Sequence, residues 1–153
     1  MIEKRKTMEI PAIEYGTVID HIPADVTLRA MDILGDSFHN YTATLGTNFP
    51  SKRMGKKGFI KIEGAVISQD QANKIAIIAP KATFNLIKDG KVIKKSTLEL
   101  PDIIEEILKC PNPECITNHA QAKTNFHVLK EEPLSLRCHY CERTLQRTDL
   151  VFK

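Results

Sequence analysis

The sequence predicts an α+β fold made of two unequal parts. Through residues 1–100, segments with the two-residue period of strands alternate with segments of helical period. The turn dipeptide Asp89-Gly90 joins two of the strand-like segments. All four cysteines lie further on, as two closely spaced pairs. We therefore predict one domain over residues 1–100 and a small metal-stabilised domain over residues 101–153.

The first predicted elements are a strand and a helix. Residues 10–22 are rich in β-branched side chains and are followed by Pro23, which favours a strand that ends there. Gly35 stands where a helix C-terminal cap is expected. Between them, apolar residues recur at helical spacing, at Ala24, Leu28, Met31 and Leu34.

Two alternating segments come next and predict strands. They cover residues 41–48 and 59–66. In the second segment we expect Ile60, Ile62 and Val66 to face the core, because they alternate with Lys61, Glu63 and Ala65.

A second helix and a hairpin complete the first domain. Ser68 and Gln71 form a capping box, and Pro80 stops the helix. The strand-like runs 82–88 and 91–97 then flank Asp89-Gly90. The resulting order, β-α-β-β-α-β with one extra hairpin strand, predicts a ferredoxin-like antiparallel sheet with two helices on one face.

The part after Pro101 is predicted to be small, β-rich and similar to a zinc ribbon. Residues 102–109 fit either a helix or a strand, and three short strand-like runs follow at 125–129, 134–137 and 144–152. A domain of about fifty residues buries too little apolar surface to be stable without an additional cross-link. We expect a metal ion to supply that stabilisation.

The candidate metal ligands are Cys110, Cys115, Cys138 and Cys141. Two pairs, Cys-x4-Cys and Cys-x2-Cys, can place four thiolates around one tetrahedral ion, which favours Zn²⁺. Four thiolates leave no open position, so the zinc is expected to be structural, and nearby His119, His127 and His139 are not needed as ligands. An iron centre of rubredoxin type, two disulfides and four unrelated cysteines are the alternatives.

Composition excludes several classes of protein. The chain of 153 residues is 42% hydrophobic, with a formal net charge of +3. This is ordinary globular composition, and the charge is too small to indicate bulk binding to nucleic acid or membranes. No apolar run approaches the roughly 18 residues of a membrane span, and no secretory signal is recognised. We expect a soluble, cytoplasmic protein.

Basic residues gather in two stretches of the first domain: Lys52, Arg53, Lys56, Lys57 and Lys61, then Lys88, Lys91, Lys94 and Lys95. Such groups form either a solvated face or an anion site. Asp20-His21 is similarly either a polar turn or a contact to ribose and phosphate. Neither a nucleophile–base constellation nor a phosphate-binding loop is present in the sequence, so we do not expect an enzyme.

Three segments resemble a known family, the regulatory chains of aspartate carbamoyltransferase. They are GTVIDHIP at residues 16–23, APKATFN at 79–85, and the pair CPNPEC and CHYC that holds the cysteines. The resemblance covers essentially the whole chain. It implies a non-catalytic allosteric subunit of pyrimidine biosynthesis, inhibited through CTP and UTP and activated through ATP. It also implies regulatory homodimers and a zinc domain that docks on the catalytic chain.

The same resemblance implies a nucleotide site in the first domain. Asp20 and Lys61 would lie near the ribose, and His21, Asn85 and Lys95 near the phosphates. The pocket would be lined by Ile10, Ala12, Ile13, Val18, Ile87 and Val92. The competing interpretation is a zinc-ribbon protein that binds nucleic acid, although the exposed aromatic stripe typical of single-strand binding is not evident.

Overall fold

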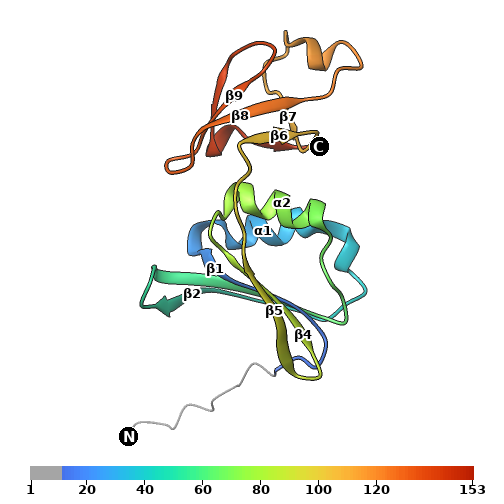
Figure 1. The fold of residues 1–153 in the computed structure, drawn as a ribbon, viewed down its shortest axis with the longest axis vertical. Helices are drawn as coiled ribbons and strands as arrows, with labels where there is room; N and C mark the ends of the chain where they lie inside the picture. The colour runs from blue at the N-terminus through green and yellow to red at the C-terminus, as the bar shows by residue number, and fades with distance from the viewer. Residues whose placement is uncertain (1–11) are drawn as a thin grey trace, which may run out of the picture.

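A computed structural model describes residues 12–153, and Figure 1 shows two domains stacked along its long axis. The first domain is built from five strands, two α-helices and two short 3-10 helices. In chain order these are β1 (Gly16–Pro23), η1 (Ala24–Val26), α1 (Thr27–Leu34), η2 (Gly35–Phe38), β2 (Ala43–Ser51), β3 (Gly55–Glu63), α2 (Gln69–Ile78), β4 (Thr83–Lys88) and β5 (Lys91–Thr97). The predicted α+β class is confirmed.

The five strands form one antiparallel sheet in the order β2-β3-β1-β4-β5. Sheets of this kind bury one face under helices and alternate their side chains between the faces. Ile19 of β1 and Ile60 and Ile62 of β3 are fully buried on the face that α1 and α2 cover. The opposite face of the sheet therefore carries the alternate residues of each strand.

Local sequence signals predicted the ends of several elements correctly. The capping box of Ser68 and Gln71 starts α2, with both reciprocal hydrogen bonds present. Asp89 and Gly90 adopt φ of 51° and 72°, the two left-handed residues that a type I′ hairpin turn requires. Gly35 is the C-cap of α1.

Two details of the predicted core are wrong. Leu28, one of the four apolar residues at helical spacing, is 68% exposed, because the buried face of α1 carries Thr27, Ala30 and Leu34 and Leu28 lies outside it. Val66 is exposed while Ala65 is buried, the reverse of the expected alternation. The cause is that β3 ends at Glu63 and Gly64 then turns with φ of 89°, so the period of the strand does not extend to these residues.

The second domain is built from short strands. In chain order it contains β6 (Ile103–Glu105), β7 (Leu108–Lys109), η3 (Ile116–Asn118), β8 (Asn125–Lys130), β9 (Ser135–Cys138), β10 (Thr144–Gln146), η4 (Arg147–Asp149) and β11 (Val151–Phe152). Four strands form a sheet in the order β10-β9-β8-β6, and β11 pairs with β7. Residues 102–109, which fitted either a helix or a strand, contain two strands.

The two helices of the first domain lie between its sheet and the second domain (Figure 1). Buried side chains of both domains belong to one hydrophobic cluster, which includes Ile78 of α2 and Ile104 of β6. The helix-free face of the sheet consequently points away from the second domain. Within residues 12–153, neither α-helix has the length and apolarity that crossing a bilayer would require.

Gly58 of β3 provides a test of this packing. A Cβ at Gly58 would overlap the Oγ1 and Cγ2 atoms of Thr27, which begins α1 and is itself fully buried. We expect Gly58→Ala to lower the free energy of unfolding by about 3 kcal/mol, because backbone must move to admit the methyl group. Denaturant titration of the metal-loaded chain measures this.

Gly55→Ala in the same strand is the matched control. The space around Gly55 is open, so the methyl group costs only the strain of the positive φ of that residue, about 1 kcal/mol. Equal unfolding midpoints for the two variants would contradict the close approach of β3 to α1.

Candidate functional site

A cavity of about 370 Å³ opens on the helix-free face of the first sheet. This volume lies within the range of about 300–1,000 Å³ that small-molecule sites occupy. Strands β1, β3, β4 and β5 contribute to it, together with the segment before β1. The lining residues are Ala12, Ile13, Val18, Asp20, His21, Lys61, Thr83, Asn85, Ile87, Gly90, Val92 and Lys95.

A bulge in β1 brings two consecutive residues to this cavity. Ile19 pairs with Ile60 of β3, but Ile22 pairs with Gly58, so β1 has one residue more than its partner between these pairs. His21 takes up the extra length with φ of 58°. Asp20 and His21 therefore both line the cavity, while Ile19 and Ile22 on either side of them are fully buried in the core.

Hydrogen bonds hold the two bulge residues. The carboxylate of Asp20 accepts the backbone N–H of His21 at 2.7 Å and a bond from Lys57 Nζ at 2.9 Å. Nδ1 of His21 lies 3.0 Å from Oγ1 of Thr83 on the neighbouring strand β4. Burial raises the pKa of Asp20, but the hydrogen bonds and charge of Lys57 and the N–H of His21 outweigh it, and the net pKa is lowered. Asp20 is thus an anion fixed at the cavity wall.

A second bulge sets the orientation of β5. Ile87 pairs with Val92, while Leu86 pairs with Lys94, so Ile93 is the additional residue. As a result Val92 and Lys95 both line the cavity, although they are three residues apart. Lys94 instead lines a separate cavity of about 360 Å³ beneath α2, on the other face of the sheet. The adjacent residues Lys94 and Lys95 of β5 therefore lie on opposite faces of the sheet.

The cavity combines two cationic side chains, one carboxylate and an apolar wall. Lys61 comes from β3 and Lys95 from β5, two strands separated by β1 and β4. Nζ of Lys61 lies 5.7 Å from the ring centroid of Phe59. Ammonium groups suit phosphate oxygens, and a fixed carboxylate suits sugar hydroxyls. The cavity is therefore chemically able to hold a phosphorylated ligand that carries a hydroxyl-rich part.

The structure brings together all the predicted nucleotide-site residues that it describes. Ten of the eleven line this cavity, and Ile10 lies outside the described residues. Sequence reasoning missed Thr83, Gly90 and the Asp20 partner Lys57. Thr83 and Lys57 depend on strand register, since Thr83 pairs with Asp20, and Lys57 with Pro23. Gly90 was identified as a turn residue, and a turn signal does not reveal that a turn borders a cavity.

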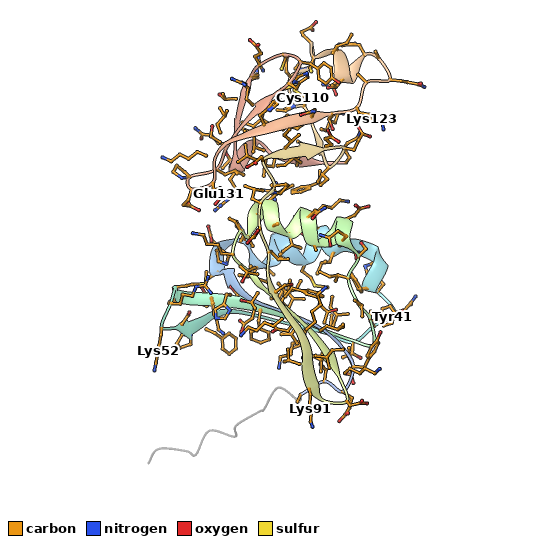
Figure 2. All side chains as sticks on the ribbon, viewed as in Figure 1. Tyr41, Lys52, Lys91, Cys110, Lys123 and Glu131 are labelled. Atoms are coloured by element: carbon orange, nitrogen blue, oxygen red, sulfur yellow. The ribbon has the colours of Figure 1, made fainter. Side chains whose placement is uncertain are left out.

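The candidate metal centre joins two loops of the second domain. Cys110 and Cys115 flank the loop after β7, and Cys138 and Cys141 flank the turn after β9. Their four Sγ atoms all lie within 4.8 Å of one another. The Cys110–Cys141 distance is 3.7 Å and the Cys115–Cys138 distance is 3.8 Å. Cys110 lies inside the second domain (Figure 2).

These distances fit a metal better than a disulfide. A tetrahedron with metal–sulfur bonds of about 2.3 Å has edges of about 3.8 Å, whereas a disulfide needs about 2.05 Å. All four cysteines are unpaired thiols in this structure. The donor set and its spacing therefore fit one tetrahedral ion with no open position, as Zn²⁺ or iron would adopt.

The surroundings of the sulfur atoms also fit a bound cation. Burial raises the pKa of the Cys110 thiol to about 12, and burial raises that of Cys138 as well. For Cys141, burial is outweighed by hydrogen bonds from the Arg143 backbone and the Asn112 side chain, and the pKa falls to about 7. A cation offsets the cost of ionising such buried thiols, because a coordinated thiol loses its proton.

The three nearby histidines have other contacts. Nε2 of His119 lies 2.6 Å from the carbonyl oxygen of Pro113, and Nε2 of His127 lies 3.0 Å from Nδ1 of His139. The cluster of possible metal ligands found within residues 12–153 consists of the four cysteines alone. Asn118 donates to the carbonyl oxygens of Cys110 and Asn112, at 2.9 and 2.7 Å, and so fixes the first ligand loop.

Comparisons with known proteins match both domains. Residues 8–99 match the family model of the aspartate carbamoyltransferase regulatory chain, allosteric domain. Residues 102–151 match the metal binding domain of the same regulatory chain. The chain is 49% identical to the aspartate carbamoyltransferase regulatory chain of Thermococcus kodakarensis, over 95% of this chain and 97% of that one. Identity is 47% to that of Pyrococcus abyssi, over 94% and 96%, and 42% to that of Parabacteroides distasonis, over 99% and 98%.

The Asp20–Lys57 pair supports a prediction about pH. In Lys57→Met the burial of Asp20 loses its main opposing contact, so the pKa of Asp20 should rise from its present lowered value. A carboxyl with a lowered pKa stabilises the fold above its unfolded pKa, and this stability is lost as the pH falls through the folded pKa. Carbon-detected NMR titration of the Asp20 carboxyl measures the shift.

The exposed pair of Lys153 and Glu106, at 3.1 Å, offers a control. Lys153→Met should leave the titration of Asp20 where it is in the wild type. An Asp20 pKa that stays lowered in Lys57→Met would show that the backbone N–H of His21 alone sets it.

Proposed function

The chain belongs to the aspartate carbamoyltransferase regulatory chain family, and from this premise we propose that it binds CTP, UTP and ATP as effectors in the cavity of its first domain. It is a regulatory and not a catalytic subunit, with an allosteric domain and a metal-binding domain. In the proposed function CTP and UTP inhibit the enzyme and ATP activates it, so that the supply of pyrimidines is controlled.

One observation supports the nucleotide proposal above the others: the residues that the family resemblance implies, from four strands and the segment before β1, line a single cavity. His21 and Lys95 would bind phosphate oxygens, with Asn85 beside the phosphate chain. Asp20 and Lys61 would contact the ribose. Ala12, Ile13, Ile87 and Val92 would form the apolar wall against the base. Asn85 already donates to the carbonyl oxygen of Val18 at 3.3 Å, which ties β4 to β1 at this point.

The second part of the proposal concerns assembly. A regulatory chain of this family associates with a catalytic chain. We propose that residues 101–153 dock on that chain, that residues 1–100 hold the nucleotide and pair two regulatory chains as a homodimer, and that the assembly is cytoplasmic. Nucleotides can then change catalysis only if they bind the two states of the assembly with different affinity.

The third part concerns the metal. We propose that the ion held by the four cysteines is Zn²⁺ and that its role is structural. Zinc supplies cross-links between the two ligand loops when bound, and a closed set of four thiolates offers no position to a substrate. Cys110 and Cys115 precede β8, Cys138 is the last residue of β9 and Cys141 follows it, so the ion would hold the first ligand loop against the end of β9.

Substitution of Lys95 tests the nucleotide site. We expect Lys95→Ala to weaken CTP and ATP binding by about 10–150-fold, since a hydrogen bond to a charged group contributes about 1.5–3 kcal/mol. Isothermal titration calorimetry on the full chain measures the dissociation constants.

Lys94→Ala is the matched control, because Lys94 is the preceding residue of the same strand and lines the opposite face. It removes the same charge and should leave both dissociation constants close to those of the wild type. Equal losses in the two variants would indicate a general effect of charge, and unchanged binding in Lys95→Ala would contradict the site.

Elemental analysis tests the metal. We expect one zinc per chain and a colourless protein, whereas an iron centre would be coloured. Removal of the ion with a chelator should unfold residues 101–153 and leave the first sheet protected, because the small domain depends on the metal. Hydrogen exchange of both domains before and after chelation measures this, and an intact second domain after verified loss of zinc would contradict a structural role.

A further inference from the structure

Arg29 of α1 joins the first domain to the last residues of the second. Its Nη2 donates to the carbonyl oxygen of Leu150 at 2.9 Å, and its Nη1 donates to that of Arg147 at 3.3 Å. The guanidinium also lies over the ring of Phe152, 5.7 Å from the centroid. A planar guanidinium is suited to such a forked and stacked contact, which a lysine cannot reproduce. The contact therefore fixes the orientation of α1 relative to residues 147–152.

The same helix follows the cavity residues of β1 closely in the chain. His21 of the β1 bulge lies only eight residues before Arg29 in the chain. Between them, Oγ1 of Thr27 donates to the carbonyl oxygen of Pro23 at 3.1 Å, and Oγ1 of Thr47 donates to that of Ala24 at 2.9 Å. Gly58 of β3 packs directly against Thr27. The turn from β1 into α1 is thus held by a hydrogen bond of its own and by contacts from β2 and β3.

We propose that residues 20–29 form a rigid link that carries a nucleotide-induced displacement of β1 to the end of the metal-binding domain, with Arg29 as the positioning residue at its far end. This inference rests on the proposed nucleotide function. Asp20 and His21 contact the ligand, and α1 moves together with them. The two hydrogen bonds of Arg29 then transmit this movement to residues 147–152. Without the fork, nucleotide binding persists and its effect on the catalytic chain decreases.

The test uses the complete assembly of regulatory and catalytic chains. The readout is the ratio of carbamoyltransferase activity with and without saturating ATP or CTP, alongside the nucleotide dissociation constant of the same regulatory chain measured without the catalytic chain. In Arg29→Ala we expect the nucleotide response to fall about five-fold or more, at the lower end of typical allosteric coupling. The dissociation constant should change less than about two-fold, because Arg29 is remote from the cavity.

Three further variants separate this role from a loss of stability. Arg29→Lys keeps the charge and stem but not the fork, so its response should be intermediate. Phe152→Leu removes the ring beneath the guanidinium and should reduce the response as well. Leu28→Ala keeps the backbone of the link and changes only a side chain that is exposed, so it should leave the response as in the wild type.

Hydrogen exchange on the full regulatory chain alone gives a second readout. Nucleotide should change the exchange of residues 147–152 in the wild type and not in Arg29→Ala. The inference is overturned if Arg29→Ala keeps the full response, if it loses response and affinity in parallel, or if nucleotide binds the wild type without any change at 147–152. A wild-type chain that binds no nucleotide at all overturns the proposed function as well.

Discussion

The bulge in β1 is the feature on which the candidate site depends. The sheet is covered by helices on one face only, so each strand must alternate buried and open side chains. A binding site that uses the consecutive residues Asp20 and His21 conflicts with that alternation. The bulge resolves the conflict by placing His21 at φ of 58°, a conformation that costs a non-glycine residue about 1–2 kcal/mol. The bond between His21 and Thr83 helps to offset this cost.

The second domain meets a different constraint. Its strands are short, and the sheet of β10, β9, β8 and β6 is supported by few buried side chains, among them Phe126 and Leu136. Because such a small apolar core does not hold the loops of the domain in place, another interaction must do so. The four sulfur atoms stand at tetrahedral spacing, so one ion can fix both ligand loops at once. Metal binding and folding of this domain are therefore expected to be a single equilibrium.

The sequence predicted those parts of the structure that depend on neighbours in the chain. The capping box at Ser68, the hairpin turn at Asp89-Gly90 and the strand–helix order are local, and the structure has all three. Parts that depend on register across the sheet were not predictable in this way. Lys57 reaches Asp20 only because β3 and β1 pair as they do. The residues of the cavity were predicted from the resemblance to a family. The period of the strands alone did not indicate that Lys61 and Lys95 face a common ligand.

The position of the cavity also limits how two effectors could act in opposite directions. Under the proposed function, CTP and ATP share the triphosphate and the ribose, so their contacts with Lys95, His21 and Asp20 are the same. Interactions common to both ligands cannot distinguish their effects, because only differential affinity shifts an equilibrium. The difference must come from the base, which is larger in ATP. The base would meet the apolar wall that includes Ile87 and Val92, which pair with each other on β4 and β5 beside the bulge of β5. Under the proposed function a larger base there would displace β4 and β5 relative to β1, and β1 continues through a hydrogen-bonded turn into the helix that contacts the metal-binding domain.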